Sequence, residues 1–406
     1  MNRSFPHSKW PPEADQNELD EIRRQRNIDI MMVGRTGPVK EFEEQFKAFL
    51  NNEMHYVISF NSGTSGLFAA YFAIGVDEGD FVLGPALTYH AALSPVFMLK
   101  GNVRLVDVDI NSRCIDAGKI EENICEKTKA ITVVHEWGHP AEMDKILKIA
   151  SKYNLKVIED CSHAHGSTYK GKLCGTFGDV AVFSLHARKS IYAGEGGILV
   201  TNNQEIHDRA TLLGHYRERS KYEIKNSNYH KYWFTGFGLK LRLSPFNAII
   251  AKHSLMNFPT NKAGRKKCLE YLNKRLEEIL YIRPIIVHSD ADMGAWYGYR
   301  PLYDKEKLNG LERDYLVNEL KNEGLDVASP NSKILANEPL YYEEHDLMFM
   351  NSRNKYTSVE KDYPNAQYIL DTTIILPTFY DWENDKAMID HYIDVFKKIE
   401  TKYKIK

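Results

Sequence analysis

The chain has 406 residues, of which 43% are hydrophobic, 27% charged and 12% aromatic, a composition typical of globular proteins and not of disordered or fibrous ones. This length predicts two domains, or one large domain with a smaller companion. With 53 Lys and Arg against 55 Asp and Glu, the formal charge of −2 gives no overall field that would attract nucleic acid or a membrane surface. Any anion-binding site must therefore be local.

The five cysteines are scattered, and none lies in a C-x-x-C pair. Such a set predicts neither a disulfide framework nor a cysteine zinc site, and it is typical of a reducing cytoplasm. Residues 1–27 lack the apolar core of an export signal, and no run of about 18 apolar residues indicates a membrane span. We therefore expect a cytoplasmic protein that contacts neither membrane nor nucleic acid.

From about residue 38 onward, helices and strands are predicted to alternate. The predicted order is helix 39–51, strand 55–60, helix 65–75, strand 80–85, segment 91–101, strand 102–109, helix 117–125, strand 129–134, helix 141–154 and strand 155–160. Short apolar strands between amphipathic helices predict a largely parallel sheet that is buried on both faces. Ligands of such sheets bind beyond the carboxyl ends of the strands.

After two further strands, at 178–185 and 196–203, the character of the sequence changes. Residues 214–240 are rich in Tyr, Lys, Asn and His, and we interpret them as a long, partly ordered excursion. The predicted elements that follow are helix 245–256, helix 261–280, strand 295–303 and helix 386–403. We expect an N-terminal arm at 1–37, a large domain at 38–257 and a smaller α+β domain at 258–406.

The segment 133–140, VVHEWGHP, contains the H-E-x-x-H pattern in which two histidines one helical turn apart bind zinc and the glutamate acts as a general base. That chemistry requires one continuous helix. The β-branched run 131–134 favours a strand, while Gly138 and Pro140 disfavour a helix. We therefore interpret the segment as a strand end followed by a loop, and not as a zinc peptidase site.

Three turns that follow predicted strands could bind a phosphate or a planar ring. Gly63, Thr64 and Ser65 open a helix, so free N–H groups and two hydroxyls could hold a phosphate, although the same residues also suit ordinary N-capping. Asp160 ends a buried strand, where its carboxylate either meets a cation such as a protonated ring nitrogen or caps a helix. Tyr89 follows another strand, where it could stack on a planar ring or fill the core.

The segment 183–200, FSLHARKSIYAGEGGILV, carries a candidate nucleophile. Ser184 closes a strand, and Lys189 follows in an apolar-flanked segment. A lysine desolvated beside a cationic ring loses its proton more readily and can attack an aldehyde. The alternative is that Arg188 and Lys189 are two solvated surface charges.

These motifs, in this order, resemble the sugar aminotransferases of the DegT/DnrJ/EryC1/StrS group, which are pyridoxal-phosphate enzymes of the aspartate aminotransferase fold. The likeness covers roughly residues 38–400 and runs through NSGTSGL, PALTYHAA, VDVD, VHEWGHPAEMD, VIEDCSHAHGSTYKGKLCGTFGD, FSLHARKSIYAGEGGILVTN and GLKLRLSPFNAIIA. It implies an α/β protein of PLP-dependent transferase fold type I, with a large domain whose mostly parallel central sheet is flanked by helices, and a smaller C-terminal α+β domain. In that group the VHEWGHP segment is a loop without zinc, so no metal site is expected.

The resemblance also implies roles for individual residues. Lys189 would bind pyridoxal phosphate covalently and later shuttle a proton, and Asp160 would pair with the ring nitrogen. His163 stands where many relatives have glutamine, and it would lie near the ring hydroxyl. A histidine at this position resembles the aminocyclitol and aminohydroxybenzoate branches. Tyr89 would stack on the ring. The phosphate would be held by Gly63, Thr64, Ser65 and Ser184.

One position departs from the pattern of the group. Many members complete the phosphate site with an asparagine from the partner subunit in a G-x-N-x-R segment, where this chain has GLKLR with Lys240. A lysine can serve a phosphate as a point charge, so Lys240 is predicted to act across a dimer interface. The homodimer with shared active sites follows from the resemblance alone.

The implied reaction is ping-pong transamination. Glutamate or glutamine would donate the amino group, and a keto sugar, most often nucleotide-linked, or a keto-cyclitol would accept it, in amino-sugar, surface-polysaccharide or secondary-metabolite biosynthesis. Two alternatives are a keto-sugar dehydratase, whose relatives replace the lysine with histidine, and a non-catalytic pyridoxal-phosphate-binding regulator, for which no basic helix-turn-helix segment is visible. Residues 214–235 could bind a nucleotide diphosphate or form a solvated, flexible surface.

Overall fold

The computed structural model describes residues 7–31, 34–342 and 363–403, and its central feature is a seven-stranded sheet. In spatial order the strands are β1 (Tyr56–Phe60), β9 (Gly197–Thr201), β8 (Val180–Ser184), β5 (Lys156–Asp160), β4 (Thr128–Val134), β2 (Phe81–Pro85) and β3 (Asn102–Val106). The five strands from β8 to β3 run parallel, whereas β9 runs antiparallel to both β1 and β8. The predicted α/β class with a mostly parallel sheet is confirmed.

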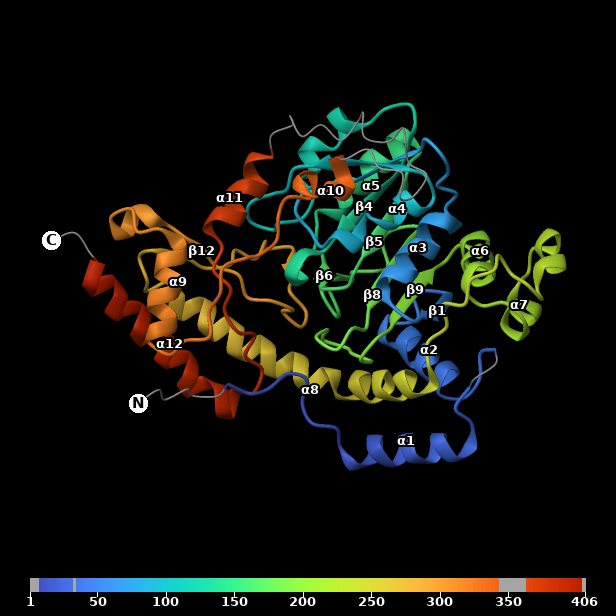
Figure 1. The fold of residues 1–406 in the computed structure, drawn as a ribbon, viewed down its shortest axis with the longest axis horizontal. Coiled ribbons are helices and arrows are strands. Elements are labelled where there is room, and N and C mark those ends of the chain that lie inside the picture. Colours follow the sequence, from blue (N-terminus) through green and yellow to red (C-terminus); the bar gives the residue numbers. More distant parts are fainter. Residues whose placement is uncertain (1–6, 32–33, 343–362, 404–406) are drawn as a thin grey trace.

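Helices flank the sheet and continue into the C-terminal part of the chain (Figure 1). They are α1 (Gln16–Ile28), α2 (Gly37–Phe49), α3 (Gly63–Ala73), α4 (Pro95–Met98), α5 (Met143–Tyr153), α6 (Gln204–Gly214), α7 (Glu218–Glu223), α8 (Pro245–Leu276), α9 (Arg313–Asn322), α10 (Pro339–Tyr342), α11 (Pro364–Thr372) and α12 (Trp382–Tyr403). Two-residue strands are β6 (Thr168–Tyr169), β7 (Lys172–Leu173), β10 (Ile282–Arg283), β11 (Ala291–Asp292) and β12 (Leu302–Tyr303). Short 3-10 turns are η1 (His90–Ala92), η2 (Ala117–Lys119), η3 (Glu121–Asn123), η4 (Glu136–Gly138), η5 (Ser227–Tyr232), η6 (Lys305–Leu308) and η7 (Leu335–Asn337).

Both faces of the sheet are buried, because successive strand residues point into different apolar clusters. Ile158 packs with residues of α3, α4 and α6, whereas its neighbour Val157 packs with residues of α5. In the same way Val182 joins the first cluster, and Phe183 joins a cluster built with α2 and α8. This period of two explains why the strands are apolar throughout.

The C-terminal part has a separate apolar core, formed by the second half of α8 with α9, β10, β12 and α12. Helix α8 is 32 residues long and carries the chain from the large sheet to this core (Figure 1). It runs unbroken through residue 258, where the sequence predicts a domain boundary. Residues 334–336 and 363–369 pack into the core of the large sheet. The division at residue 257 therefore stays a proposal, with α8 shared by both parts.

Several predicted elements differ from the structure in form. The helices expected at 245–256 and 261–280 are one helix, α8, which accommodates Pro259 in its interior. The helix expected at 117–125 consists of the turns η2 and η3. The strand expected at 295–303 is limited to β12, because the left-handed backbone of Trp296 (φ 47°) interrupts an extended conformation.

The N-terminal arm includes one helix, α1, which lies alongside α8 (Figure 1). Glu21 on α1 forms ion pairs with Lys252 and, at 2.8 Å, with His253, both on α8. These contacts fix the arm against the large domain. In the described part of the chain, no helix combines the length and apolar character that a membrane span requires.

Candidate active site

The candidate residues gather at one edge of the sheet. Because β9 is antiparallel to both β1 and β8, strands β1 and β8 point in the same direction as β5. Their carboxyl ends carry Ser184 at the end of β8 and Asp160 at the end of β5, and Gly63 opens α3 just after β1. This is the edge at which sheets of this class bind ligands.

The turn between β1 and α3 approaches Ser184 very closely. A Cβ atom placed on Gly63 would lie 2.9 Å from the Ser184 Cβ atom, so only glycine fits here without a shift. Ser62, which the sequence reading missed, caps α3 by accepting a hydrogen bond from the Ser65 N–H at 3.0 Å. Thr64 is exposed at the helix start. Ser62 caps the helix, so this turn can be N-capped and still be open as a cradle for a phosphate.

Lys189 lies in the loop between β8 and β9, and its side chain is half-buried, unlike the exposed Arg188. The Lys189 Nζ atom lies 4.2 Å from the centroid of the Tyr297 ring. The interpretation of both cations as solvated surface charges is therefore wrong for Lys189 and correct for Arg188. Among the described residues no carboxylate pairs with this amine, and an unpaired amine over an aromatic face is placed to react with a ligand aldehyde.

Asp160 and His163 are buried beside this lysine. The Oδ1 atom of Asp160 accepts a hydrogen bond from the Ser162 N–H at 2.9 Å, and within the described residues no hydrogen bond reaches Oδ2. Asp160 thus forms a local turn and does not cap a helix. The pKa of His163 is lowered by burial and by the charge of Lys189, while Glu136 and Asp160 act in the opposite direction.

Three aromatic rings form a nearly parallel group next to Lys189. The ring centroids of His163 and Tyr297 are 4.2 Å apart with an interplanar angle of 13°, and those of His163 and Trp137 are 5.1 Å apart at 12°. The Cζ atom of Arg300 lies over the Trp137 ring, 4.4 Å from its centroid. Tyr297 and Arg300 come from the C-terminal part of the chain, so both parts of the molecule build this site.

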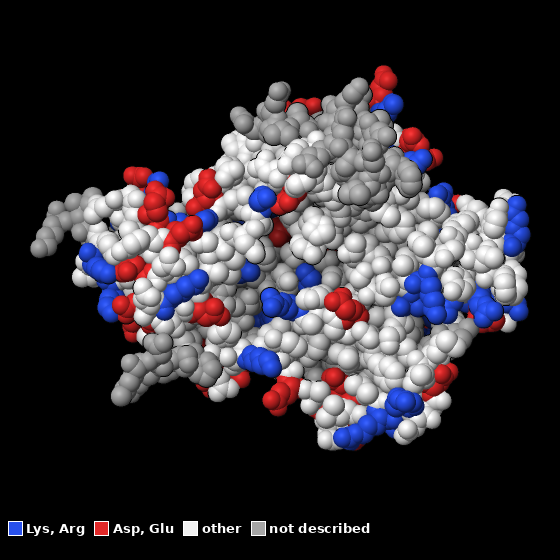
Figure 2. Space-filling view, viewed as in Figure 1, with Lys and Arg blue, Asp and Glu red and all other residues white. Residues whose placement is uncertain are grey.

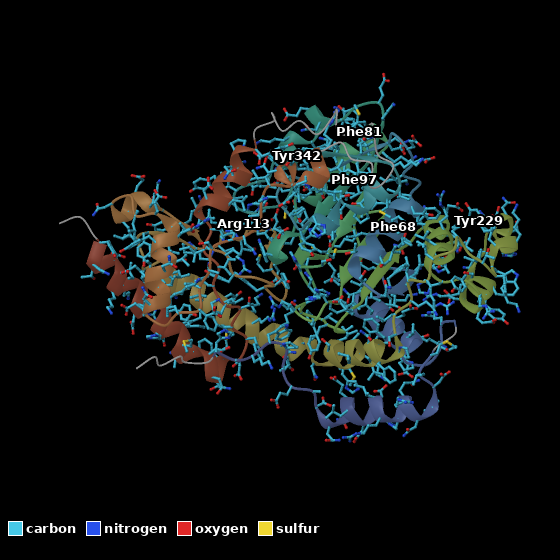
Figure 3. The ribbon with its side chains drawn as sticks, viewed as in Figure 1. Phe68, Phe81, Phe97, Arg113, Tyr229 and Tyr342 are labelled. Carbon is cyan, nitrogen blue, oxygen red and sulfur yellow. The ribbon has the colours of Figure 1, made fainter. Side chains whose placement is uncertain are left out.

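Two cations lie at this junction, the buried Arg113 and the partly buried Arg300. Arg113, labelled in Figure 3, donates a hydrogen bond from Nη2 to the Arg300 carbonyl oxygen. Burial lowers the pKa of each guanidinium to about 10. The nearby Glu136 carboxylate acts against this effect, so these charges partly balance one another.

Tyr89 and Lys240 are both exposed, and the structure does not bring them against the other site residues. Tyr89 is 67% exposed and packs its ring against His90 at 4.5 Å, so the alternative that it fills the core is wrong. Lys240 precedes Leu241, whose carbonyl oxygen accepts a hydrogen bond from the Asn61 N–H at 2.8 Å. The roles of both residues stay predictions.

The HEWGH segment is a strand end and a loop, as predicted. Strand β4 ends at Val134, and Trp137 (φ 54°) and Gly138 (φ 100°) have left-handed backbones, so no helix joins the two histidines. His139 Nδ1–H donates to the Pro140 carbonyl oxygen at 2.7 Å, and its Nε2 accepts from the His288 N–H at 3.2 Å. The helical arrangement that the zinc pattern requires is absent from this described segment.

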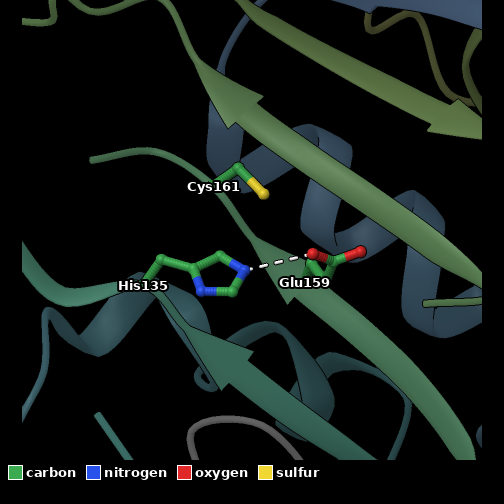
Figure 4. Close-up of side chains that lie close together, drawn as sticks. All are labelled: His135, Glu159 and Cys161. Atoms are coloured by element: carbon green, nitrogen blue, oxygen red, sulfur yellow. Dashed lines mark hydrogen bonds and ion pairs between the residues drawn. The ribbon is translucent and has the colours of Figure 1, made fainter. Parts of the chain in front are cut away.

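His135 instead belongs to a buried group with Glu159 and Cys161 (Figure 4). His135 Nδ1 accepts from the Ala141 N–H at 3.1 Å, so the proton sits on Nε2 and is donated to Glu159 Oε2, also at 3.1 Å. Three backbone N–H groups, of Gly175, Phe177 and Gly178, donate to the same carboxylate. These bonds occupy the His135 and Glu159 atoms that would ligate a metal ion, so we interpret the group as structural.

Comparisons with known proteins agree with this geometry. The model of the DegT/DnrJ/EryC1/StrS aminotransferase family matches residues 12–391. The chain is 29% identical over 351 residues to a GDP-perosamine synthase of Escherichia coli O157:H7, which covers 86% of this chain and 87% of that protein. It is 30% identical over 327 residues to a putative L-glutamine:3-amino-2,3-dideoxy-scyllo-inosose aminotransferase of Micromonospora echinospora, covering 80% and 76%. A solved aminotransferase structure from Psychrobacter cryohalolentis has a TM-score of 0.84 at 23% identity, covering 98% of this chain and 100% of that one.

The fold, the lysine loop and these likenesses define a pyridoxal-phosphate-dependent aminotransferase of fold type I. The chain belongs to the DegT/DnrJ/EryC1/StrS aminotransferase family. Its cofactor is pyridoxal phosphate, and the residues present fit that group. The Gly63 cradle suits a phosphate, the free Oδ2 atom of Asp160 suits a protonated ring nitrogen, and Lys189 suits an aldehyde.

Proposed function

We propose that this enzyme transfers an amino group from glutamate or glutamine to a keto sugar or keto-cyclitol, with a nucleotide-linked keto sugar as the first choice. Relatives that act on GDP-linked sugars and on an aminoinosose support the two acceptor classes. The observation that carries the proposal is the half-buried Lys189 amine over the Tyr297 ring, on the loop after β8 at the edge of the sheet where Asp160 ends β5. Amino-sugar biosynthesis for a surface polysaccharide or a secondary metabolite is the expected context.

The proposed roles follow from what each side chain can do where it stands. Lys189 binds the cofactor and moves a proton, because its amine has no competing carboxylate in the described residues. Asp160 holds the proton on the ring nitrogen, and pyridoxal phosphate supplies an electron sink when bound. His163 would lie next to the ring hydroxyl. The phosphate is held by Gly63, Thr64, Ser65 and Ser184, with Tyr89 stacked on the ring and Lys240 reaching in from the second subunit of a homodimer.

A surface around α7 is the proposed site for the charged part of the acceptor. Lys and Arg side chains gather at the end of the molecule where α7 lies (Figures 1 and 2). Arg217 lies over the Phe234 ring at 5.2 Å, and Lys221 lies over the Trp233 ring at 5.2 Å. Cations held on aromatic faces are suited to a nucleotide diphosphate, because the cations can pair with the phosphates and an aromatic ring can stack on the base.

A keto-sugar dehydratase on the same fold is the main alternative. Lys189 argues against a dehydratase, because the dehydratases of this group are expected to have histidine at that position. A regulator that binds the cofactor without catalysis would retain Lys189 but would not convert an amino donor. One experiment separates transamination from binding of the cofactor without catalysis.

That experiment follows the visible absorption band of the cofactor-loaded protein while L-glutamate or L-glutamine is added. Loss of the band with formation of the oxo acid is the expected result, and restoration of the band by a keto-sugar nucleotide would identify the acceptor class. Lys189→Ala is the inactive control, and Arg188→Ala, which changes the exposed neighbour, is the matched active control. A stable band with both donors would contradict the proposed transamination.

A further inference from the structure

Glu136, the glutamate of the HEWGH segment, is a buried carboxylate that the proposed reaction does not use. It is 5% exposed, and burial of a carboxylate is unfavourable unless hydrogen bonds or cations compensate it. Its Oε2 atom accepts a hydrogen bond from the Thr88 hydroxyl at 3.1 Å, and its Oε1 atom lies 3.4 Å from Nδ1 of His163. Within the described residues, no backbone N–H donates to it.

The neighbouring pair His135–Glu159 shows what a purely structural arrangement looks like in this fold. Glu159 receives three backbone N–H groups in addition to His135, so its hydrogen-bonding capacity is filled. Within the described residues, the side-chain partners of Glu136 are Thr88 and His163, and its charge also acts on the guanidiniums of Arg113 and Arg300. A carboxylate with spare acceptor capacity beside the active-site histidine points to a role in controlling a proton.

The Nδ1 atom of His163 has two contacts that exclude each other. The Trp137 N–H can donate to Nδ1 at 3.3 Å only when Nδ1 carries no proton. Nδ1 can donate to Glu136 Oε1 at 3.4 Å only when it carries one. The position of one proton therefore decides which contact forms.

The His163 ring cannot easily escape this choice by turning away. It is buried and lies nearly parallel to the rings of Trp137 and Tyr297. In the part of the chain that the structure describes, no hydrogen bond reaches the other ring nitrogen, Nε2. Nε2 is thus available to a ligand, and its state is linked through the ring to the state of Nδ1.

The charged groups around His163 come from several elements. Lys189, from the loop after β8, disfavours the protonated imidazole, whereas Glu136 from η4 and Asp160 from β5 favour it. Arg113 and Arg300 oppose Glu136 from the junction with the C-terminal part.

We propose that Glu136 is a positioning residue that competes with the Trp137 N–H for Nδ1 of His163 and would hold a proton there, so that the Nε2–H of the imidazolium would donate to the ring oxygen of pyridoxal phosphate. This inference rests on the proposed placement of His163 beside that oxygen. A charged donor at this oxygen withdraws negative charge from the ring. Glu136 thereby tunes the cofactor without touching it.

The test compares Glu136→Gln with the wild type in two measurements on the full-length chain. In the cofactor-free protein, NMR titration of labelled histidines, with His163→Asn used for assignment, should show a lower pKa for His163 in the variant. In the cofactor-loaded protein, the pH titration midpoint of the visible band should move to higher pH, and the Kd for pyridoxal phosphate should rise roughly tenfold.

Two control variants separate a proton-holding role from a structural one. Glu136→Asp retains the negative charge and should restore most of both shifts, while Glu142→Gln, on a glutamate that pairs with Lys145 at 2.6 Å, should change neither. An unchanged His163 titration in a folded Glu136→Gln protein would overturn the inference. Should that variant not fold, a Glu136→Asp protein whose His163 titrates like the wild type supports the inference, and one that titrates far lower overturns it. Failure of the donors to convert the cofactor would count against the proposed function alone, because neither titration uses a substrate.

Discussion

Gly63 and Ser184 lie far apart in the sequence of the large domain, yet a Cβ atom on Gly63 would lie 2.9 Å from the Ser184 Cβ atom. Gly63→Ala should therefore push the α3 start away from β8 and open the proposed phosphate cradle. We expect the Kd for pyridoxal phosphate to rise by roughly tenfold, because displaced N–H groups lose charge-assisted hydrogen bonds. Fluorescence titration with the cofactor measures this.

Gly118→Ala is the matched control for that substitution. An added Cβ there would meet only the Asp116 side chain, at 3.2 Å, and Gly118 lies in the η2 turn away from the site. Equal cofactor affinity of the two variants would show that the close approach of Gly63 to Ser184 does not shape the cofactor site.

Asp160→Asn should lose most of the catalytic rate while retaining the fold. The amide keeps the shape and can still accept the Ser162 N–H, which now bonds to Oδ1 at 2.9 Å. It cannot hold a proton on the ring nitrogen, so we expect kcat to fall by at least about a hundredfold. Steady-state assays with the identified donor test this, and turnover within a few-fold of the wild type would refute the role of Asp160.

Acid should destabilise the protein partly through His139. Burial lowers the pKa of His139 to about 4 from its usual 6.5, and the hydrogen bonds to Pro140 and from His288 fit only the neutral ring. At pH above 6.5 the ring is neutral whether or not the protein is folded, so it contributes no pH dependence. Between pH 6.5 and about 4 only the unfolded chain takes up the proton, so the free energy of unfolding decreases as pH falls through this window.

His139→Gln should flatten that decrease between pH 6.5 and 5, as measured by urea unfolding at each pH. The exposed His55 serves as the control, and His55→Gln should leave the slope unchanged. Equal slopes in the wild type and His139→Gln would mean that other groups cause the acid sensitivity.

Arg219 should contribute strongly to stability by anchoring α7. It is 3% exposed, and its Nη1 and Nη2 atoms donate to the fully buried Glu43 carboxylate at 2.8 and 3.1 Å. Arg219→Met leaves that carboxylate with less compensation, so we expect a loss of about 3 kcal/mol in the free energy of unfolding. Denaturant unfolding provides the measurement.

The double variant Arg219→Met with Glu43→Gln should recover part of that loss, because the unpaired buried charge is removed. An exposed pair supplies the comparison. Lys40 and Glu44 lie 3.8 Å apart at the surface, and Lys40→Met should cost less than about 1 kcal/mol. A loss at Arg219 as small as that at Lys40 would show that the buried network does not hold α7.

The order of strands and helices in the large domain could be predicted from the sequence, because each strand is a short apolar run and the helices between them are amphipathic. The same pattern placed Asp160 and Ser184 at strand ends. It could not place Tyr297 beside Lys189, since that contact joins parts of the chain far apart in sequence. Apolar composition also favoured a strand at 295–303, where the left-handed backbone of Trp296 interrupts it.

The HEWGH segment shows both the use and the limit of motif reading. Local propensity correctly excluded a helix, since β-branched residues precede Gly138 and Pro140. Nothing local indicated that His135 and Glu136 would turn to different partners, Glu159 and His163. Those pairings depend on β4 lying next to β5, which only the sheet order determines.

The most direct test of the account is to load the enzyme with pyridoxal phosphate, reduce it with borohydride and locate the modified residue by peptide mass spectrometry. We predict a cofactor-sized mass increase on the peptide that contains Lys189, and none in a protein first converted with an amino donor. Modification of a different lysine, or an unmodified Lys189 in the freshly loaded enzyme, would contradict it.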